Sequence, residues 1–438
     1  MANRIVKIED ICHVVKGETG IMKAIPGEYP MVVLSEERKT HNKYQFDCKA
    51  VIIPLVSSTG HGHASMKRIH YQEGKFALGS ILCALIPKNE GEYDPEYLYH
   101  ILDMGKERIF VPLMKGMANV SLPLNRIKTV EINLPPYDEQ VRQSKIYSEV
   151  TTNLDLLRNQ TDKQHKYLKQ LRQSILQMAV QGKLTAQWRE ENPNVEPASV
   201  LLEKIKEEKE KLIKEGKIRR EKPFPKITVS EKVFELPSEW EWARLVDYGI
   251  TNTGTTPSKD NPEYFGNNYP FVKPAEISLK GIKYDTEDGL TELGLQQGRL
   301  IPKNSVLMVC IGGSIGKSYF TDRDVSCNQQ INTITPLLGI SSEFLHYFLQ
   351  SEYFQKTVWS NASGATTPIV NKGKWEQIAI PMLPFDEQNE IVSMVNQLMK
   401  LCDELEKKIE KRDSDQERIM QAVVKQAFTT KIETVETE

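Results

Sequence analysis

The sequence has no stretch that could anchor the chain in a membrane or direct it out of the cell. No apolar run among its 438 residues approaches the roughly 18 residues of a membrane-spanning helix, and the first residues lack the shape of a signal peptide. The six cysteines form no C-x-x-C pair and no metal-ligand spacing. These absences predict a cytoplasmic protein with reduced thiols and no metal.

An excess of charge of one sign is also lacking. The chain has 57 lysine and arginine residues against 59 aspartate and glutamate residues, a net charge of −2. It is no polycation, yet a local basic surface would be enough to bind nucleic acid. Net charge therefore neither supports nor excludes that function.

Three stretches resemble catalytic or ligand-binding motifs and fail on their spacing. Residues Gly312–Ser318 read G-G-S-I-G-K-S, but a phosphate loop needs glycine where Ile311 stands, so a tight turn after a buried strand is favoured. Residues Asn133–Tyr137 interrupt the N-P-P-Y motif of amino-methyltransferases with an extra leucine. His61 and His63 lack a cysteine or carboxylate at ligand spacing. We predict no catalytic residue, cofactor or metal on this chain.

A long heptad pattern occurs twice in the sequence. It follows P-Y-D-E-Q at Pro136 and P-F-D-E-Q at Pro384, 248 residues later. Apolar residues then recur at steps of three and four, which is typical of a helix that pairs with another helix. The predicted seam residues are Val150, Leu154, Leu157, Leu168 and Leu171 in the first helix and Leu398, Cys402, Leu405, Ile409 and Ile419 in the second. We predict that the two helices pack antiparallel as a coiled coil within one chain.

Each heptad motif follows a stretch with the features of a mixed α/β domain. In the first stretch, residues 51–56 and 76–86 are apolar runs typical of buried strands, residues 96–102 are helical in pattern, and residues 39–45 and 57–70 are polar loops. The pattern also predicts a short last strand at residues 130–134.

The second stretch repeats the first in outline. Glu343–Leu349 corresponds to Glu96–Leu102, and Gly254 corresponds to Gly17. We also match Ser305–Leu307 with Ser80–Leu82. Between these points the halves share little, which indicates a tandem duplication with dissimilar interiors. We predict a mixed α/β fold of two tandem, similarly folded domains, separated by the paired helices and related by a pseudo-twofold axis. The predicted parts are domain 1 (1–135), the first long helix (136–183), a connector (184–236), domain 2 (237–383), the second long helix (384–432) and a tail (433–438).

The connector has its own charged helix. Residues 199–215 carry apolar side chains along one side only, and the basic, proline-containing run 217–226 follows them. Two interpretations stay open for these charges: a solvated helix face, or a contact with phosphate groups.

Five stretches together are distinctive: Pro136–Gln140, Pro384–Gln388, Leu171–Ala179, Gly182–Thr185 and Leu236–Trp242. In combination they resemble the specificity (S) subunits of type I restriction-modification systems. The resemblance covers nearly the whole chain, although Thr429-Thr430-Lys431 replaces the Gly-Lys-Leu-Thr that ends the first helix.

The resemblance implies a non-catalytic subunit that recognises DNA. In that family, each target recognition domain reads one part of a split, asymmetric site. The paired helices hold the domains apart and bind two modification subunits, which use S-adenosylmethionine to methylate adenine. Two restriction subunits join them and supply ATP- and Mg-dependent translocation and cleavage.

Base readout needs polar side chains at base edges, while contacts to phosphates fix position. The polar loops of this chain, at residues 39–45, 57–70, 255–268 and 328–332, supply such side chains. The predicted DNA-binding residues are Lys43, Gln45, Lys67 and Arg68 in the first domain and Thr256, Ser258, Lys259, Asn261 and Gln329 in the second.

Two rival functions remain open from the sequence. One is the DNA-binding part of another bipartite system, such as a fused restriction-modification enzyme, against which the absence of catalytic motifs weighs. The other is a coiled-coil scaffold whose globular ends bind proteins.

Overall fold

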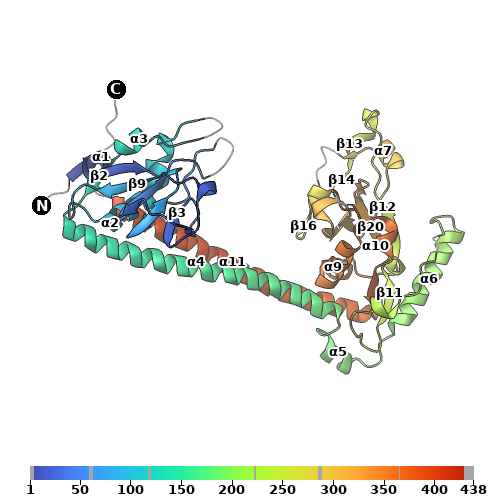
Figure 1. Ribbon diagram of the computed structural model, residues 1–438. Helices are drawn as coiled ribbons and strands as arrows, with labels where there is room; N and C mark the ends of the chain where they lie inside the picture. The colour runs from blue at the N-terminus through green and yellow to red at the C-terminus, as the bar shows by residue number, and fades with distance from the viewer. Residues whose placement is uncertain are drawn as a thin grey trace. The chain divides into compact units, whose positions relative to one another are not determined.

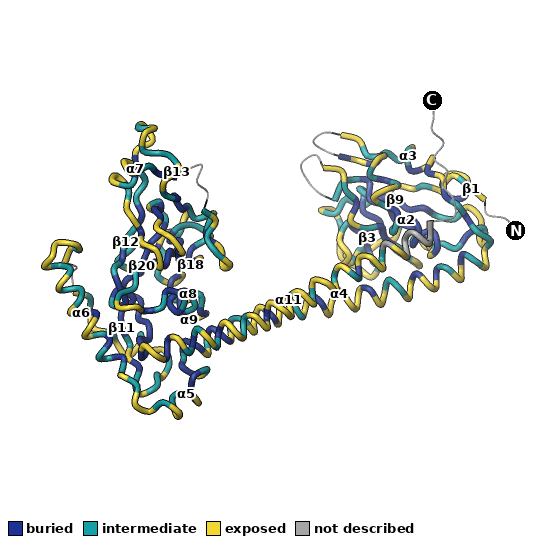
Figure 2. The backbone as a smooth tube through the Cα atoms, turned by 180° about the vertical axis from the view of Figure 1, so that it is seen from behind, coloured by how far each residue is buried: buried dark blue, intermediate teal, exposed yellow. Residues whose placement is uncertain are grey.

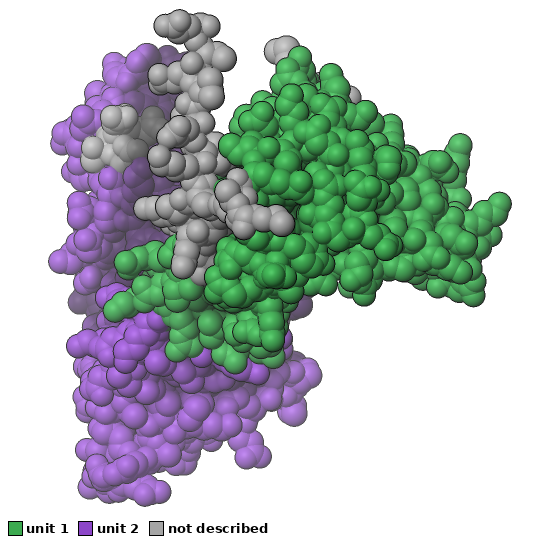
Figure 3. Space-filling model, turned by 90° about the vertical axis from the view of Figure 1, so that its left-hand side faces the viewer, with its two compact units in different colours: residues 1–163, 409–438 green, residues 164–408 purple. Residues whose placement is uncertain are grey.

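The computed structural model of the protein describes residues 4–58, 63–116, 120–220, 223–284, 289–364 and 366–428. Within this part of the chain, no helix has the length and apolar character needed to span a bilayer. The chain divides into two compact units: residues 1–163 with 409–438, and residues 164–408 (Figure 3). Each unit contains one α/β domain and a part of both long helices. The predicted tail and Thr429–Lys431 lie outside the described residues.

The domain of unit 1 is built on two four-stranded sheets. One is antiparallel with strand order β2-β9-β6-β7, and the other has the order β4-β3-β8-β5 with β3 and β8 parallel. A separate antiparallel pair, β1 and β10, joins the start of the domain to its end. The strands are β1 (Arg4–Lys7), β2 (Cys12–Lys16), β3 (Tyr29–Val32), β4 (Lys39–His41), β5 (Phe46–Asp47), β6 (Ala50–Pro54), β7 (His70–Gln72), β8 (Lys75–Leu78), β9 (Leu82–Pro87) and β10 (Glu131–Leu134). The helices are α1 (Ile8–Ile11), α2 (Pro95–Ile109) and α3 (Leu124–Lys128).

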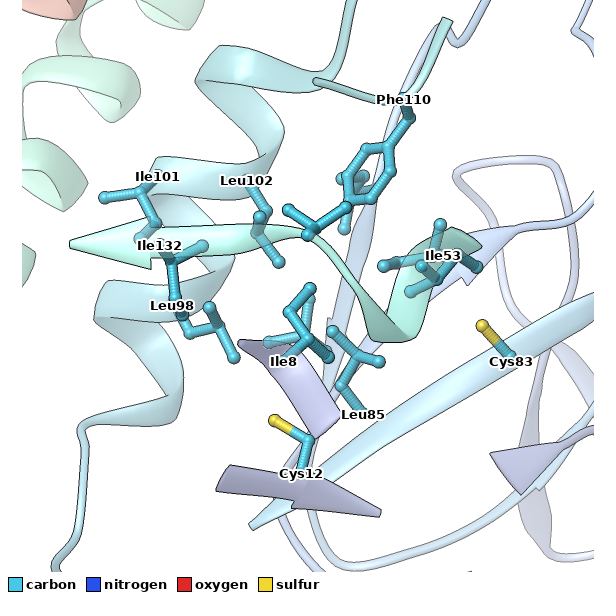
Figure 4. Close-up of a cluster of buried hydrophobic side chains, with 14 of the residues drawn as sticks. Ile8, Cys12, Ile53, Cys83, Leu85, Leu98, Ile101, Leu102, Phe110 and Ile132 are labelled. Atoms are coloured by element: carbon cyan, nitrogen blue, oxygen red, sulfur yellow. The ribbon is translucent and has the colours of Figure 1, made fainter. Parts of the chain in front are cut away.

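An apolar core lies between α2 and the first sheet (Figure 4). Leu98 and Leu102 of α2 are fully buried there beside Ile53 of β6. The neighbouring residue Ile52 belongs to a second core, with strands of the other sheet. Strand β6 is thus buried on both faces, which explains why its sequence is a continuous apolar run rather than an alternating one. Helix α2 begins after Asp94, whose carboxylate accepts bonds from two free backbone N–H groups.

The predicted elements of this domain are largely confirmed. Strands β6 and β10 and helix α2 lie where the apolar patterns place them. The run at 76–86 is two strands rather than one, because the chain turns where Leu82 N–H donates to Gly79 O. The loop predicted at 39–45 begins with strand β4.

The domain of unit 2 (Figure 1) repeats the main sheet and the terminal strand pair, but in place of the second four-stranded sheet it has two two-stranded sheets, the parallel pair β14 and β19 and the antiparallel pair β15 and β16. Its main sheet has the order β12-β20-β17-β18, again antiparallel, and β11 pairs with β21 as β1 pairs with β10. The strands are β11 (Glu241–Arg244), β12 (Gly249–Thr253), β13 (Phe265–Tyr269), β14 (Phe271–Val272), β15 (Ile277–Ser278), β16 (Gly281–Ile282), β17 (Val306–Val309), β18 (Ser318–Phe320), β19 (Ser326–Cys327), β20 (Ile331–Pro336) and β21 (Ala379–Met382). The helices are α7 (Glu292–Gln297), α8 (Ser342–Gln350), α9 (Glu352–Ser360) and α10 (Lys372–Glu376).

The duplication is confirmed, and one match within it is wrong. Helix α8 follows β20 as α2 follows β9, and the bridge between Ser363 and Ile369 repeats the bridge between Lys115 and Ser121. Val306 and Leu307, however, belong to β17, whose place in the sheet is that of β6, not of β9. Two buried strands of similar composition are easily mistaken for one another when only the sequence is compared, because their order in the sheet is set by pairing partners far away in the chain.

Two 44-residue helices, α4 (Tyr137–Val180) and α11 (Phe385–Phe428), lie side by side (Figure 1). In unit 2, the Arg172 guanidinium of α4 donates to Asp403 Oδ1 at 2.7 Å and to Glu406 Oε2 at 3.2 Å. Farther along the chain, Thr185 meets Glu387 near the start of α11. The helices therefore run antiparallel, as predicted. The pseudo-twofold relation of the two domains stays a prediction.

The seam between the helices is only partly the predicted one (Figure 2). Of the predicted residues, Leu154, Leu168 and Cys402 are buried, and Val150, Leu398 and Ile409 are half-buried. The other four are exposed, so their assignment to the seam is wrong: Leu157 (37%), Leu171 (44%), Leu405 (45%) and Ile419 (51%).

The error comes from the phase of the heptad, not from its period. From Leu168, the inward position is four residues on, at Arg172, rather than three residues on, at Leu171. Arg172 bonds across to the partner helix, and in unit 1 Gln416 Nε2 donates to the buried Thr161 hydroxyl at 3.3 Å. Polar layers of this kind fix the register of a helix pair.

One buried carboxylate in unit 2 joins three of the sequence motifs. Glu387 Oε1 accepts bonds from Thr185 Oγ1 at 2.6 Å and from Arg189 Nη1 at 2.5 Å, and its Oε2 accepts from Trp240 Nε1 at 2.6 Å. We call these four residues the Glu387 cluster. Arg189, in helix α5 (Ala186–Glu191), also donates to Gly182 O at 2.7 Å. Residues of the P-F-D-E-Q, G-K-L-T and L-P-S-E-W motifs thus meet at one packing site.

Gly182 ends α4 as predicted. Its φ is +69°, and a Cβ there would lie 2.7 Å from Pro237 Cγ, so only glycine fits both the left-handed turn and the close approach. The last residue of each five-residue motif makes the same kind of hydrogen bond in both copies. The amides of Gln140 and Gln388 donate to the carbonyls of Pro135 and Leu383.

Candidate nucleic-acid interface

In the first domain, the loop after β2 is held tightly against the sheet. Gly17 N–H donates to Leu82 O at 2.9 Å, and a Cβ at Gly17 would lie 2.2 Å from Gly79 O. The amide of Gln45 then bridges the loop: its Oε1 accepts from Glu18 N–H at 3.1 Å and its Nε2 donates to Lys16 O at 3.0 Å. Gln45 uses both ends of its amide to shape the loop.

The second domain repeats the turn with different side chains. Gly254 N–H donates to Ile331 O at 3.0 Å, and a Cβ at Gly254 would lie 2.1 Å from Asn328 O. Here the loop is held by Thr256, whose hydroxyl donates to Gln329 Oε1 at 2.6 Å. The structure thus brings together two predicted DNA-binding residues that are 73 positions apart.

The remaining predicted residues lie on the surface of the loops or beside it. Lys43, Lys67 and Lys259 are exposed, and no carboxylate among the described residues pairs with them. Arg68 pairs with Glu36 at 3.2 Å, an exposed contact that costs little to exchange for a phosphate. Ser258 and Asn261 begin the short turn before strand β13: the Ser258 hydroxyl donates to Asp260 Oδ2, and Asn261 O accepts from the Tyr264 N–H.

Two arginines near these loops were not anticipated from the sequence. Arg38 donates to Gln72 Oε1 at 3.1 Å and lies 3.2 Å from His70 Nδ1, while Arg299 donates to Asn252 Oδ1 at 2.5 Å. Burial, with a smaller effect of Arg38, lowers the pKa of His70 to about 4, so its ring is neutral at neutral pH. Neither contact leaves a local signal, because the partners are 32 to 47 positions apart.

The thiols behind the second loop are not poised for nucleophilic chemistry. Burial raises the pKa of Cys310 and of Cys327 to about 12, so both stay protonated at neutral pH. Among the described residues, no group of three His, Cys, Asp or Glu side chains could hold a metal ion. His61 and Gly62 lie outside the described residues.

Comparison with known proteins assigns this architecture of two tandem domains to a family. Residues 3–164 and 237–412 match the family described as type I restriction modification DNA specificity domain. The chain therefore belongs to this family, with two of its domains in tandem.

Individual relatives agree with this assignment. The chain is 31% identical over 249 residues to the type I restriction enzyme EcoAI specificity subunit of Escherichia coli, a match that covers 54% of this chain and 40% of that relative. It is 23% identical over 430 residues to the EcoDI specificity subunit of Escherichia coli, covering 96% and 87% of the two chains. A solved structure, described as the basis of complex assembly and conformational transition of the type I R-M system, has the same fold, with a TM-score of 0.63, 16% identity and coverage of 98% and 97%.

Proposed function

We propose that this chain is the non-catalytic DNA sequence-recognition subunit of a type I restriction-modification complex, acting in the cytoplasm. It reads a bipartite, asymmetric site in double-stranded DNA, one domain per half-site. The observation that carries the proposal is a shared frame with different loops. Both domains keep the sheet order and the glycine turn, but Gln45 shapes the first loop where Thr256 and Gln329 shape the second.

Such a division suits sequence recognition physically. A rigid sheet fixes where a loop meets the DNA, and exposed lysines on that loop contact phosphates without reading sequence. Polar side chains of the same loop face the base edges, where hydrogen-bond patterns differ between base pairs. Changing the loops of one domain changes one half of the target and leaves the frame intact.

The outer faces of the long helices serve as docking surfaces in this proposal. Leu157 and Leu405 are exposed at equivalent positions, and so are Leu171 and Ile419. Exposed apolar side chains in a repeated pattern indicate a protein partner rather than solvent. We assign them to two modification subunits that carry S-adenosylmethionine, with two restriction subunits that use ATP and Mg joining the complex.

Exchange of one domain tests the modular reading. Residues 1–135 are replaced by the first domain of another family member, and the methylated sites are mapped by sequencing after expression with the modification subunits. We expect one half of the recognised sequence to change and the other half and the spacing to stay. The reciprocal exchange of residues 237–383 is the control and should change the other half only. A change in both halves after either exchange contradicts the proposal.

Activity should depend entirely on the partner subunits. The purified chain alone is expected to transfer no methyl group to DNA, to cut no DNA and to hydrolyse no ATP. Addition of the modification subunits should establish methylation of adenine at a defined site. Methyl incorporation by the chain alone, measured with labelled S-adenosylmethionine, would refute the non-catalytic role.

A further inference from the structure

The charged connector is fixed to the second domain rather than free in solvent. Helix α6 (Ala198–Lys214) buries Leu201 and Ile205, and Lys209 Nζ donates to Val246 O at 2.6 Å. The chain that follows is held by the buried Arg244, which donates to Pro225 O at 3.0 Å and pairs with Glu231. The Arg244 guanidinium lowers the pKa of the Glu231 carboxyl to about 2, so the pair remains charged at neutral pH.

An open groove of about 1100 Å³ lies between this connector and strand β12. Its walls are formed mainly by α6, the chain at 217–220 and 223–227, and β12, and the residues that line it include nine lysine or arginine side chains and two carboxylates. We call it the basic groove. Four of the nine cations pair with carboxylates within or beside it, namely Lys217, Arg220, Arg244 and Lys372.

Other cations of the basic groove keep their charge uncompensated. Lys206, Arg219 and Lys226 are exposed, and no carboxylate among the described residues pairs with any of them. Arg299 bonds only to the neutral amide of Asn252 among its described neighbours. Like charges lining one concave surface repel one another and concentrate the potential there, which favours an anion with several charges.

The basic groove is continuous with the recognition loop of the second domain. Thr253, Gly254 and Thr255 line its wall, and the next residue is Thr256, which bonds to Gln329. An anion lying in the groove would therefore lie beside the loop that reads bases in the proposed function. The cations come from separate elements along an open surface, as a chain of phosphates requires, rather than converging on one closed pocket.

We propose that the basic groove binds the sugar-phosphate backbone of DNA next to the half-site read by the second domain. The connector thereby adds affinity without adding sequence information. This inference rests on the proposed function, because the DNA must be the one that the second domain recognises.

Salt dependence of DNA binding tests this proposal. In the full chain, co-purified with the modification subunits, Lys206, Arg219 and Lys226 are replaced together by glutamine. The control replaces Lys204, Lys211 and Lys214 by glutamine; these residues lie on α6 outside the groove, and their replacement changes the net charge equally. The slope of log K against log salt concentration is measured on cognate and unrelated duplexes. Each lost phosphate contact should reduce this slope by about one.

For the groove variant, we expect the slope of log K against log salt concentration to be smaller in magnitude by about two to three on both duplexes. The variant should still methylate the same sequence, and the control should keep the wild-type slope. Equal slopes for the two variants would overturn the proposal. So would loss of the modification subunits from the groove variant with an unchanged slope, which would make the groove a protein-docking site. If the wild-type complex shows no preference for any sequence, the proposed function fails instead.

Discussion

Replacement of Glu387 by alanine is expected to lower the free energy of unfolding of unit 2 by about 3–5 kcal/mol. The carboxylate is fully buried and is shared by the Thr185 hydroxyl, the Arg189 guanidinium and the Trp240 indole N–H. The substitution takes this acceptor from the buried Thr185 hydroxyl and Trp240 indole N–H, and it removes the counter-charge of Arg189, which keeps only its bonds to Gly182 O and Thr185 Oγ1 among the described residues. All five tryptophans lie in residues 164–408, so urea unfolding followed by tryptophan fluorescence reports on unit 2 alone.

The first copy of the motif supplies the matched control. Glu139 holds the same position as Glu387, but its carboxylate binds Arg142 and Gln143 on the helix surface, with Arg142 Nη2 at 2.6 Å. Glu139→Ala should leave the fluorescence transition unchanged. Glu387→Gln, which keeps an acceptor but loses the charge, should lie between wild type and Glu387→Ala. Equal transitions for Glu387→Ala and Glu139→Ala would show that the Glu387 cluster does not stabilise the fold.

Replacement of Leu168 by aspartate is expected to cost about 3–5 kcal/mol of stability, because the new charge is placed in the helix seam. Leu168 is 6% exposed, whereas Leu171, one turn further along α4, is 44% exposed. Leu171→Asp makes the same chemical change at the surface and should leave thermal unfolding nearly unchanged.

The same two variants separate folding from assembly. Under the proposed function, Leu171→Asp should weaken co-purification with the modification subunits although the chain folds normally. Leu168→Asp should reduce the yield of folded chain first. If Leu171→Asp destabilises the chain as much as Leu168→Asp does, the seam lies where the sequence placed it and not where the structure does.

The sequence by itself determined the elements and the duplication. The strand at Ala50–Pro54, the helix at Pro95–Ile109 and both long helices follow from local apolar periodicity, which depends on neighbours within a few positions. The end of α4 at Gly182 follows from the conformations that only glycine adopts readily. Two copies of one five-residue motif before heptad helices were enough to predict an antiparallel intrachain pair.

The tertiary structure decided the phase of the seam. Apolar residues occupy two adjacent stripes on α4, one with Leu168 and one with Leu171, and a single helix gives no sign of which stripe faces its partner. The polar contacts of Arg172 with Asp403 and Glu406 settle that choice, and they join residues more than 200 positions apart.

The tertiary structure also decided which polar residues work together. The sequence predicted Gln45 as a DNA-binding residue, yet its side-chain amide accepts a hydrogen bond from Glu18 N–H and donates one to Lys16 O. The sequence left open whether the charges of the connector are solvated or contact phosphate groups, and it did not show that the apolar side of α6 is buried or that several basic residues of the connector line a groove with β12. Hydrogen bonding and charge act through space, so a sequence shows which groups are present and only the fold shows which of them meet.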